Sequence, residues 1–358
     1  MVASALPLAL IRLTSRKHWR QSMNTMFVAD PPSTSPQLSY RAIERRTASD
    51  LPYERFVTEY LDRNLPVIIS GAAPQWNAMR TWTPQFFKDR FGSMIVNVSY
   101  QTKMPMNELI DAILASTPEK PGPYLHKVLI YRDMPELLED LSPDSTYAFP
   151  RRYAGALMPS RFQRPDGFLK LLIGGAGGKF PLMHYDTDNS HAMITEIYGD
   201  KEFILFPPED TKYMYPFENS DHTSQIENPD QADLTKYPLF AKATQYRGTV
   251  YPGDAILIPS AWWHAARALN PSISVCTNMM YRSNWPGFID QCCDPAVMKN
   301  PLNRTIKRVY LRSLGSVLSA CEGLQRALPK GGFSKKLAEF APLYRQQLPT
   351  EVRYPKSR

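Results

Sequence analysis

The chain has 358 residues, enough to bury a substantial core in one large domain or two. Hydrophobic residues make up 43% and charged residues 21% of the chain, which excludes an intrinsically disordered protein and predicts a globular one. The net charge of +8 leaves open an anionic partner, which could be RNA, DNA, phospholipid or an acidic protein.

Cysteine usage and the N-terminus bear on localisation. None of the four cysteines forms a C-x-x-C pair, which predicts a reducing, intracellular compartment, with the cytoplasm as the first choice. Residues 1–37 have no acid before Asp30 and carry Lys and Arg residues after an apolar stretch, so they predict a disordered tail or a mitochondrial targeting segment. No run reaches the roughly 18 apolar residues of a membrane span, and no membrane contact is expected.

Residues 38–145 predict an α/β lead-in to the main domain. Apolar residues at helical spacing alternate with short apolar or alternating runs that are typical of strands. The predicted helices are 49–64, 83–92 and 106–116, and the predicted strands are 65–72 and 94–100.

Residues 146–290 have a different character, because short strand candidates follow one another between Gly, Pro and Asp turns. Such a series predicts an antiparallel sandwich or barrel. A polar insertion at 207–248 interrupts it, and an insertion of that length is typical of a functional or packed lid. The strand candidates are 167–174, 191–199, 201–208, 249–259, 264–269 and 272–281.

Residues 291–358 predict a helical C-terminal segment. Its apolar residues at helical spacing would pack on the barrel or on a second subunit. Its basic residues would face solvent, and a nucleic-acid or partner patch is the alternative. The apolar positions are Leu302, Ile306, Val309, Leu314, Val317, Cys321 and Leu324, and the basic ones are Arg304, Lys307, Arg308 and Arg312.

The stretch "MHYDTDNSH", residues 183–191, places His184 and Asp186 two positions apart. On a strand, residues i and i+2 project to the same face, so an imidazole nitrogen and a carboxylate oxygen could bind one divalent metal. His264 follows an apolar strand and a proline and is the best candidate for a third ligand. Two histidines and one carboxylate leave three adjacent positions open, which suits non-haem Fe(II) that holds a cosubstrate and dioxygen. An isolated H-x-D usually binds nothing, so the prediction rests on all three residues.

Lys201 begins the strand candidate "KEFILF", whose two faces are both apolar beyond the first pair. Periodicity therefore does not decide whether Lys201 faces inward or lies in solvent. If it faces inward, it needs an anionic partner, because an unpaired buried ammonium is costly. The distal carboxylate of a metal-chelating dicarboxylate could be that partner.

These stretches together resemble a cupin-like JmjC domain. The resemblance lies in residues 171–210, 228–240 and 250–281, and residues 63–92 resemble the N-terminal segment of the small hydroxylases of this class. The class contains asparaginyl, lysyl and tRNA-base hydroxylases that depend on Fe(II) and 2-oxoglutarate.

The resemblance implies a mainly β fold, a double-stranded β-helix (jelly-roll) core with flanking helices. It implies that His184, Asp186 and His264 bind iron and that Lys201 binds the distal carboxylate of 2-oxoglutarate. Asn278 matches a position that contacts the cosubstrate or the groups around the metal.

One position departs from the family pattern. Many members carry Thr or Ser about three residues before the first ligand, where this chain has Pro181. Tyr198 or Thr195 would then have to supply the missing hydroxyl. His191 is expected to support the site rather than to bind metal.

The resemblance implies a dioxygenase that hydroxylates a C–H bond of a protein side chain. The alternatives are a hydroxylase of a tRNA or other nucleic-acid base, and a metal-binding cupin scaffold without turnover. A homodimer through the C-terminal helices would follow a habit of the family.

Overall fold

The computed structural model describes residues 40–98, 102–142, 145, 147–148, 152, 156–158, 169–180, 182–329 and 331–340. The predicted tail at 1–37 and Pro181 lie outside these residues.

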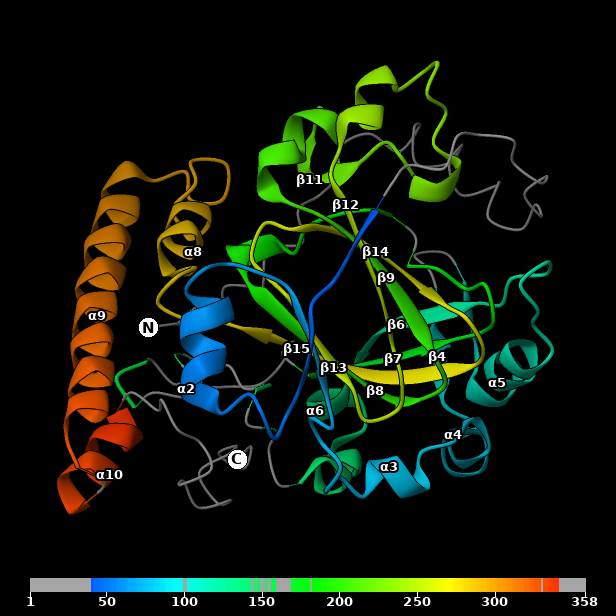
Figure 1. The fold of residues 1–358 in the computed structure, drawn as a ribbon, viewed down its shortest axis with the longest axis horizontal. Coiled ribbons are helices and arrows are strands. Elements are labelled where there is room, and N and C mark those ends of the chain that lie inside the picture. Colours follow the sequence, from blue (N-terminus) through cyan, green and yellow to red (C-terminus); the bar gives the residue numbers. More distant parts are fainter. Residues whose placement is uncertain are drawn as a thin grey trace, which may run out of the picture.

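Two sheets form the centre of the fold (Figure 1). Neighbouring strands are antiparallel except in the pairs β1–β12 and β2–β3. This arrangement confirms the predicted jelly-roll core with flanking helices. In order across the smaller sheet lie β1 (Tyr40–Ala42), β12 (Gln245–Val250), β9 (Lys201–Phe206) and β14 (Trp263–Ala268). In order across the larger sheet lie β2 (Arg45–Thr47), β3 (Val67–Ser70), β13 (Ala255–Ile258), β8 (His191–Tyr198), β15 (Ser272–Met279), β7 (Leu169–Gly174) and β6 (Tyr124–Leu129).

The space between the sheets is filled mainly by apolar side chains. Phe203 and Leu205 of β9 pack there against Ile194 of β8 and Ile256 of β13. Side chains alternate along a strand, so Lys201 projects to the same inner face as Phe203. Lys201 has no exposed surface, and the question that periodicity left open is answered: this lysine faces inward.

The turn between β8 and β9 fixes where Lys201 enters the interior. Gly199 adopts φ +74°, a left-handed conformation that glycine tolerates best. A Cβ at this position would collide with the backbone oxygen of Pro271. The tight turn predicted at Gly199 and Asp200 is confirmed.

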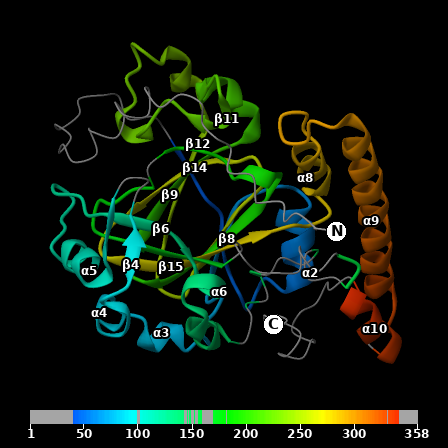
Figure 2. The ribbon, with the colours of Figure 1, turned by 180° about the vertical axis from the view of Figure 1, so that it is seen from behind.

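Helices cover the outer face of the larger sheet (Figure 2). Thr83 starts α4 by accepting the N–H of Phe86 with its hydroxyl, while Pro84 takes the first helical position. Phe87 of α4 and Leu109 of α5 pack in one core with sheet residues such as Ile173. The covering elements are α2 (Tyr53–Phe56), which continues into a π-helical turn (Val57–Leu61), α3 (Ala78–Thr81), α4 (Pro84–Phe91), α5 (Met106–Leu114), α6 (Ile130–Asp133) and a 3-10 helix (Pro135–Leu141).

The predicted lead-in shares its core with the main domain. Strands β2, β3 and β6 come from residues 38–145, yet they lie in the larger sheet beside strands from the C-terminal half. Strand β1 of this segment lies in the smaller sheet beside β12, and β4 (Ile95–Asn97) and β5 (Lys103–Pro105) pair with each other. The boundary at residue 145 therefore stays a proposal.

The insertion at 207–248 is folded against the outer face of the smaller sheet. Its Met214 and Phe240 pack on Phe206 of β9 and Trp263 of β14. It contains 3-10 helices at Pro208–Tyr213, Pro229–Gln231 and Pro238–Lys242, a small hairpin of β10 (Pro216–Phe217) and β11 (Ser220–Ser224), and the start of β12.

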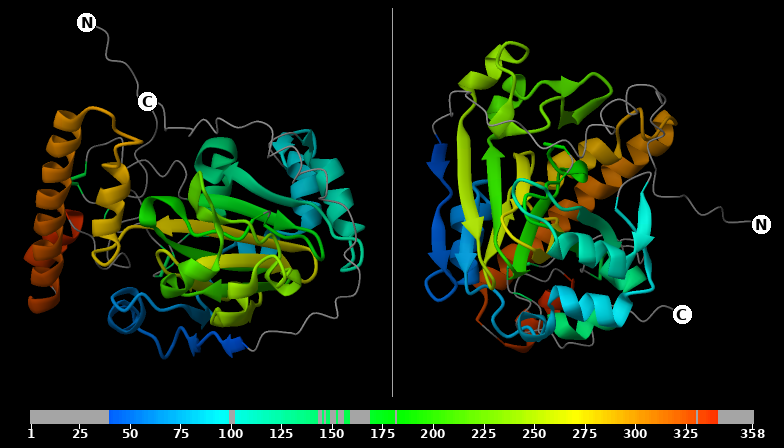
Figure 3. Two further views of the ribbon diagram at one scale, coloured as in Figure 1. Left: turned by 90° about the horizontal axis from the view of Figure 1, so that it is seen from above. Right: turned by 90° about the vertical axis from the view of Figure 1, so that its right-hand side faces the viewer.

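Three C-terminal helices complete the described chain: α8 (Trp285–Cys292), α9 (Pro301–Ala327) and α10 (Gly332–Phe340). Figure 3 shows α8 between α9 and the sheets. Leu311, Leu314 and Leu318 of α9 pack against Trp285 and Phe288 of α8. Within the described residues, no helix combines the length and apolar character that crossing a lipid bilayer requires.

The prediction of which apolar residues of α9 pack against the rest of the fold was largely wrong. Of the apolar residues that were predicted to pack, only Leu314 is buried. The helix carries apolar residues on two faces, and helical spacing alone does not tell which face meets the barrel. The exposed members are Leu302, Ile306, Val309, Val317 and Leu324.

The basic residues of α9 do not form the predicted solvent face. Arg304 donates to the carbonyl oxygen of Met298, and Lys307 donates to that of Cys292. Arg308 pairs with Asp290 of α8 at 2.9 Å. Arg312 is exposed, whereas the other three are partly exposed, with partners in α8 or in the loop before α9.

Candidate active site

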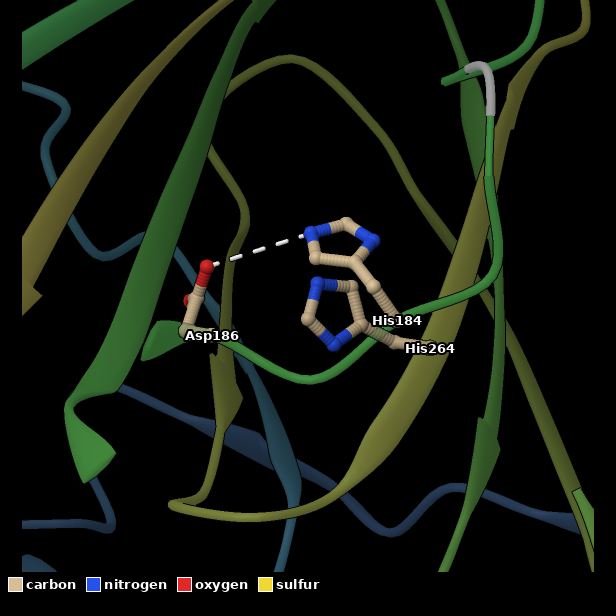
Figure 4. Close-up of side chains that lie close together, drawn as sticks. All are labelled: His184, Asp186 and His264. Carbon is tan, nitrogen blue, oxygen red and sulfur yellow. Dashed lines mark ion pairs between the residues drawn. The ribbon is translucent and has the colours of Figure 1, made fainter. Parts of the chain in front are cut away.

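His184 and His264 lie opposite each other although 80 positions separate them in the sequence. The N–H of His264 donates to the carbonyl oxygen of His184 at 2.7 Å, and the N–H of His184 donates back to that of His264 at 3.2 Å. This reciprocal pairing is that of an antiparallel ladder and places both side chains on one side. Their ring centroids are 4.4 Å apart (Figure 4).

Asp186 points to the same place as the two imidazoles (Figure 4). One of its carboxylate oxygens lies 3.9 Å from Nε2 of His184. One potential ligand atom from each of the three residues lies within 4.8 Å of the others, the only such group among the described residues. The segment that carries these residues is not a regular strand, since His184 forms isolated bridges and Asp186 precedes a 3-10 helix at Thr187–Asn189. The backbone at Asp186 is nevertheless extended, so the i, i+2 projection holds.

Both imidazoles are held in the same way. Nδ1 of His184 lies 2.9 Å from the carbonyl oxygen of Leu182, and Nδ1 of His264 lies 3.0 Å from that of Trp262. A carbonyl oxygen only accepts, so each Nδ1 carries the proton and each Nε2 keeps its lone pair for a metal. Burial, with repulsion from His264, lowers the pKa of His184 to about 3, so this ring is neutral at physiological pH.

Asp186 is kept ionised by its surroundings. Asn278 donates to its carboxylate at 3.1 Å, and Lys170 donates to the amide oxygen of Asn278 at 2.8 Å. Burial alone would raise the pKa of Asp186, but the attraction of His264 and Lys170 outweighs it and lowers the pKa. The structure therefore places Asn278 on the carboxylate of Asp186, and its contact with a metal or cosubstrate stays a prediction.

Lys201 forms a second polar cluster deeper between the sheets. Its ammonium donates to the hydroxyl of Ser274 and lies 3.4 Å from a carboxylate oxygen of Glu196. The ring centroid of Tyr124 is 5.5 Å away. The anionic partner that a buried lysine requires is thus supplied by the chain itself.

One strand connects the two clusters. Ser274, Cys276 and Asn278 alternate along β15 and share its inner face. Asn278 lies at the Asp186 end and Ser274 at the Lys201 end, four residues or about 13 Å apart along the strand. Side chains from both ends shorten this gap, so one small ligand could contact both clusters.

Sequence reasoning missed Glu196, Ser274 and Tyr124 and favoured other hydroxyls. Thr195 alternates with Glu196 on β8 and faces away from the interior, and Tyr198 is 38% exposed. The hydroxyl beside Lys201 belongs to Ser274. Alternation along the predicted strand 272–281 could have paired Ser274 with Asn278, whereas nothing in the sequence pointed to Tyr124.

His191 lies outside the three-residue cluster. Its Nδ1 accepts the N–H of Ser260 at 3.0 Å, and its Nε2 lies 3.2 Å from the hydroxyl of Ser283. Burial lowers its pKa to about 3. It is a buried, neutral residue that ties β8 to two loops.

Comparison with known proteins gives relatives that include proteins named as demethylases or Jumonji C proteins and one named for tRNA modification. Lysine-specific demethylase 8 of Danio rerio is 29% identical over 236 residues, which are 62% of this chain and 55% of that protein. Jumonji C domain-containing protein 5 of Drosophila melanogaster is 28% identical over 239 residues, 62% of this chain and 56% of that protein. The tRNA wybutosine-synthesizing protein 5 of Danio rerio is 25% identical over 288 residues, 72% of this chain and 80% of that protein. The chain spans about half the length of the first two relatives.

The family follows from a longer match. The sequence profile of the cupin-like domain matches residues 92–285, more than half of the chain, and the match includes both polar clusters. The fold, the cluster of two histidines and an aspartate, and the JmjC-type relatives agree with it. The chain belongs to the cupin-like, JmjC-type family of 2-oxoglutarate-dependent oxygenases.

Proposed function

We propose that this protein is an Fe(II)- and 2-oxoglutarate-dependent dioxygenase that hydroxylates a C–H bond of a protein side chain. The observation that carries the proposal is the convergence of two imidazole nitrogens and one carboxylate oxygen within 4.8 Å. Two nitrogen donors and one carboxylate suit divalent iron and leave adjacent positions open for a cosubstrate.

The chain has residues that suit both Fe(II) and 2-oxoglutarate. His184, Asp186 and His264 would hold the iron, and Lys201 with Ser274 would hold the distal carboxylate of 2-oxoglutarate. When bound, iron and 2-oxoglutarate supply the oxidising power, because decarboxylation of the cosubstrate activates dioxygen for attack on a C–H bond.

The chain itself supplies orientation and a dry interior. The carbonyl oxygens of Leu182 and Trp262 fix the two rings, and Asn278 fixes the carboxylate. The ring of Phe180 stacks on His184 at 4.4 Å between centroids, which limits its rotation. The apolar side chains between the sheets exclude water from the reacting groups.

The insertion at 207–248 borders the site and is proposed to select the substrate. The N–H of Tyr185 donates to the carbonyl oxygen of His222, and the N–H of Ser224 donates to that of Met183. Strand β11 is therefore hydrogen-bonded to the segment that carries His184 and Asp186. His222 of this strand is half-buried, and its backbone oxygen accepts the N–H of Tyr185, between the two predicted ligands.

A protein substrate is favoured over RNA because three of the four basic residues of α9 already bind other groups of the chain. Lys307 and Arg308 bind groups of α8, and Arg304 binds the loop before α9. RNA stays the alternative, because one relative is named for tRNA wybutosine synthesis. Loss of a salt-sensitive RNA mobility shift on charge reversal at Arg312 would favour it.

The test is turnover of 2-oxoglutarate. We expect the protein with Fe(II) to form succinate, and Asp186→Ala to form none above background. A substrate captured on Asp186→Ala should gain 16 Da when the wild-type protein is added, which mass spectrometry detects. Metal binding without succinate would instead support the non-catalytic scaffold.

Localisation in the cytoplasm, with mitochondrial import as the alternative, is also a proposal. It depends on residues 1–37, and fractionation of cells that express the chain with and without this segment would separate the two.

A homodimer through α9 is proposed from its unpartnered apolar residues. Leu302, Ile306, Val309, Val317 and Leu324 recur at helical spacing on a face that no other described element covers. This face lies apart from the Leu314 face that packs on α8.

We expect Val309→Asp to convert the dimer into a monomer, since a carboxylate in the centre of an apolar interface must be desolvated. Light scattering after size exclusion measures the mass. Ser316→Asp, which adds the same charge to an exposed position beside the stripe, should keep the dimer. A wild-type protein that is already monomeric would contradict the proposal.

A further inference from the structure

Glu196 is a buried carboxylate that the proposed reaction does not use. It projects from β8 into the space between the sheets and has no exposed surface. Neither of its oxygens accepts a well-aligned hydrogen bond, although Lys201 and the hydroxyls of Ser272 and Ser274 lie beside the carboxylate. Buried carboxylates normally have a partner, and the partner of Glu196 is Lys201, the lysine that is proposed to bind the cosubstrate.

Glu196 forms an ion pair with Lys201. Lys201 of β9 is the cation that faces it, at 3.4 Å. Tyr124 of β6 and Cys276 of β15 are the other titratable groups that face it, and burial raises the pKa of both. Asp254 contacts Glu196 only through its backbone, since its carboxylate pairs with Arg45. With Glu196 ionised, the charges of Glu196 and Lys201 therefore cancel before any ligand binds.

A dicarboxylate cosubstrate changes this balance. Its distal carboxylate would meet Lys201 beside Glu196, so two carboxylates would share one ammonium in a buried place. Two like charges at such a separation cannot both stay ionised, and one takes up a proton.

Glu196 is the group suited to take that proton. Burial raises its pKa to about 7, although the attraction of Lys201 acts in the opposite direction. Protonation of Glu196 near neutral pH therefore costs little free energy. A neutral Glu196 can donate its O–H to the incoming carboxylate.

We propose that Glu196 makes cosubstrate binding proton-linked: 2-oxoglutarate binds to Lys201 together with one proton on Glu196. The inference rests on the proposed function, because it assumes that Lys201 receives the distal carboxylate. It makes Glu196 the residue that sets how cosubstrate affinity depends on pH.

Calorimetry of the full chain loaded with Mn(II) tests this, since Mn(II) accepts the same nitrogen and oxygen donors. Titration with 2-oxoglutarate in two buffers of different ionisation enthalpy gives the number of protons taken up. We expect close to one proton at pH 8.5 and few at pH 6. The dissociation constant should rise roughly 20-fold between pH 6.5 and pH 8.5, as linkage to one proton requires.

Two variants and one analogue make the result specific. Glu196→Gln should bind 2-oxoglutarate with no proton uptake and a pH-independent affinity, whereas Glu209→Gln, which removes an exposed carboxylate, should behave as wild type. The analogue 2-oxobutyrate lacks the distal carboxylate, so its binding to wild type should take up no proton. The wild-type measurements need no variant and stand even if Glu196→Gln folds poorly.

The contrary outcomes are distinct. Binding of 2-oxoglutarate without proton uptake overturns this inference and leaves the proposed function intact. Equal proton uptake with 2-oxobutyrate places the proton at the metal end and also overturns it. Failure of both ligands to bind the Mn(II)-loaded chain overturns the proposed function, and the inference with it.

Discussion

His184→Ala will not form the weak visible absorption band that Fe(II) and 2-oxoglutarate should give with the wild-type protein in the absence of oxygen. The variant loses one of three protein ligands, and Asp186 and His264 alone hold divalent iron too weakly. Succinate formation should fall by at least about 1,000-fold, since every later step depends on bound iron. Anaerobic absorption spectroscopy and a succinate assay measure the two effects.

His191→Ala is the matched control, because His191 is also a buried histidine with a pKa lowered to about 3. It should keep the band, since His191 lies outside the ligand cluster. It should lose about 1–3 kcal/mol of stability, because the N–H of Ser260 is left unpaired. A band that survives in His184→Ala and disappears in His191→Ala would show that the ligand assignment is wrong.

The elements of the fold were predictable where the signal is local. Short apolar runs between turn residues predict the strands near 191–199, 201–208 and 272–281, and the structure has β8, β9 and β15 there. Strand partners were not predictable in the same way. Nothing within β2, β3 or β6 tells that they complete the larger sheet, because pairing depends on residues far away in the chain.

The residues of the candidate site differ in the same way: some have a local signal in the sequence and others have none. His184 and Asp186 stand out by their spacing. His264 stands out by its place after an apolar strand and a proline, and the family resemblance pointed to the same residue. Glu196 gave no signal, because the strand that carries it is apolar on both faces and alternation cannot tell which face is inside. For the same reason the sequence did not tell which way Lys201 points. Helical spacing likewise did not tell which apolar face of α9 is buried.

The buried pair of Lys201 and Glu196 leads to the second large effect, on stability. We expect Lys201→Met to lower the free energy of unfolding by about 3–5 kcal/mol at pH 8, because it leaves a buried carboxylate without its cation. Adding Glu196→Gln should restore most of the loss, since the double variant buries no charge. Urea denaturation measures both, and a double variant as unstable as Lys201→Met would show that the loss comes from packing instead.

The pH dependence of this loss has a definite sign. Burial already raises the pKa of Glu196 to about 7 in the folded protein, and removal of Lys201 takes away the attraction that opposes this rise. Below the ordinary pKa of 4.5, Glu196 is protonated in the folded and unfolded states alike, and no penalty arises. Between about pH 5 and pH 7 the unfolded chain releases the proton while the folded wild type and the folded variant both hold it, so both lose stability alike. Above about pH 7 the wild type releases the proton and the variant keeps it, so the loss caused by Lys201→Met grows there. Lys201→Met should therefore be closest to wild type near pH 5, and an equal loss at pH 5 and pH 8 would exclude Glu196 as its origin.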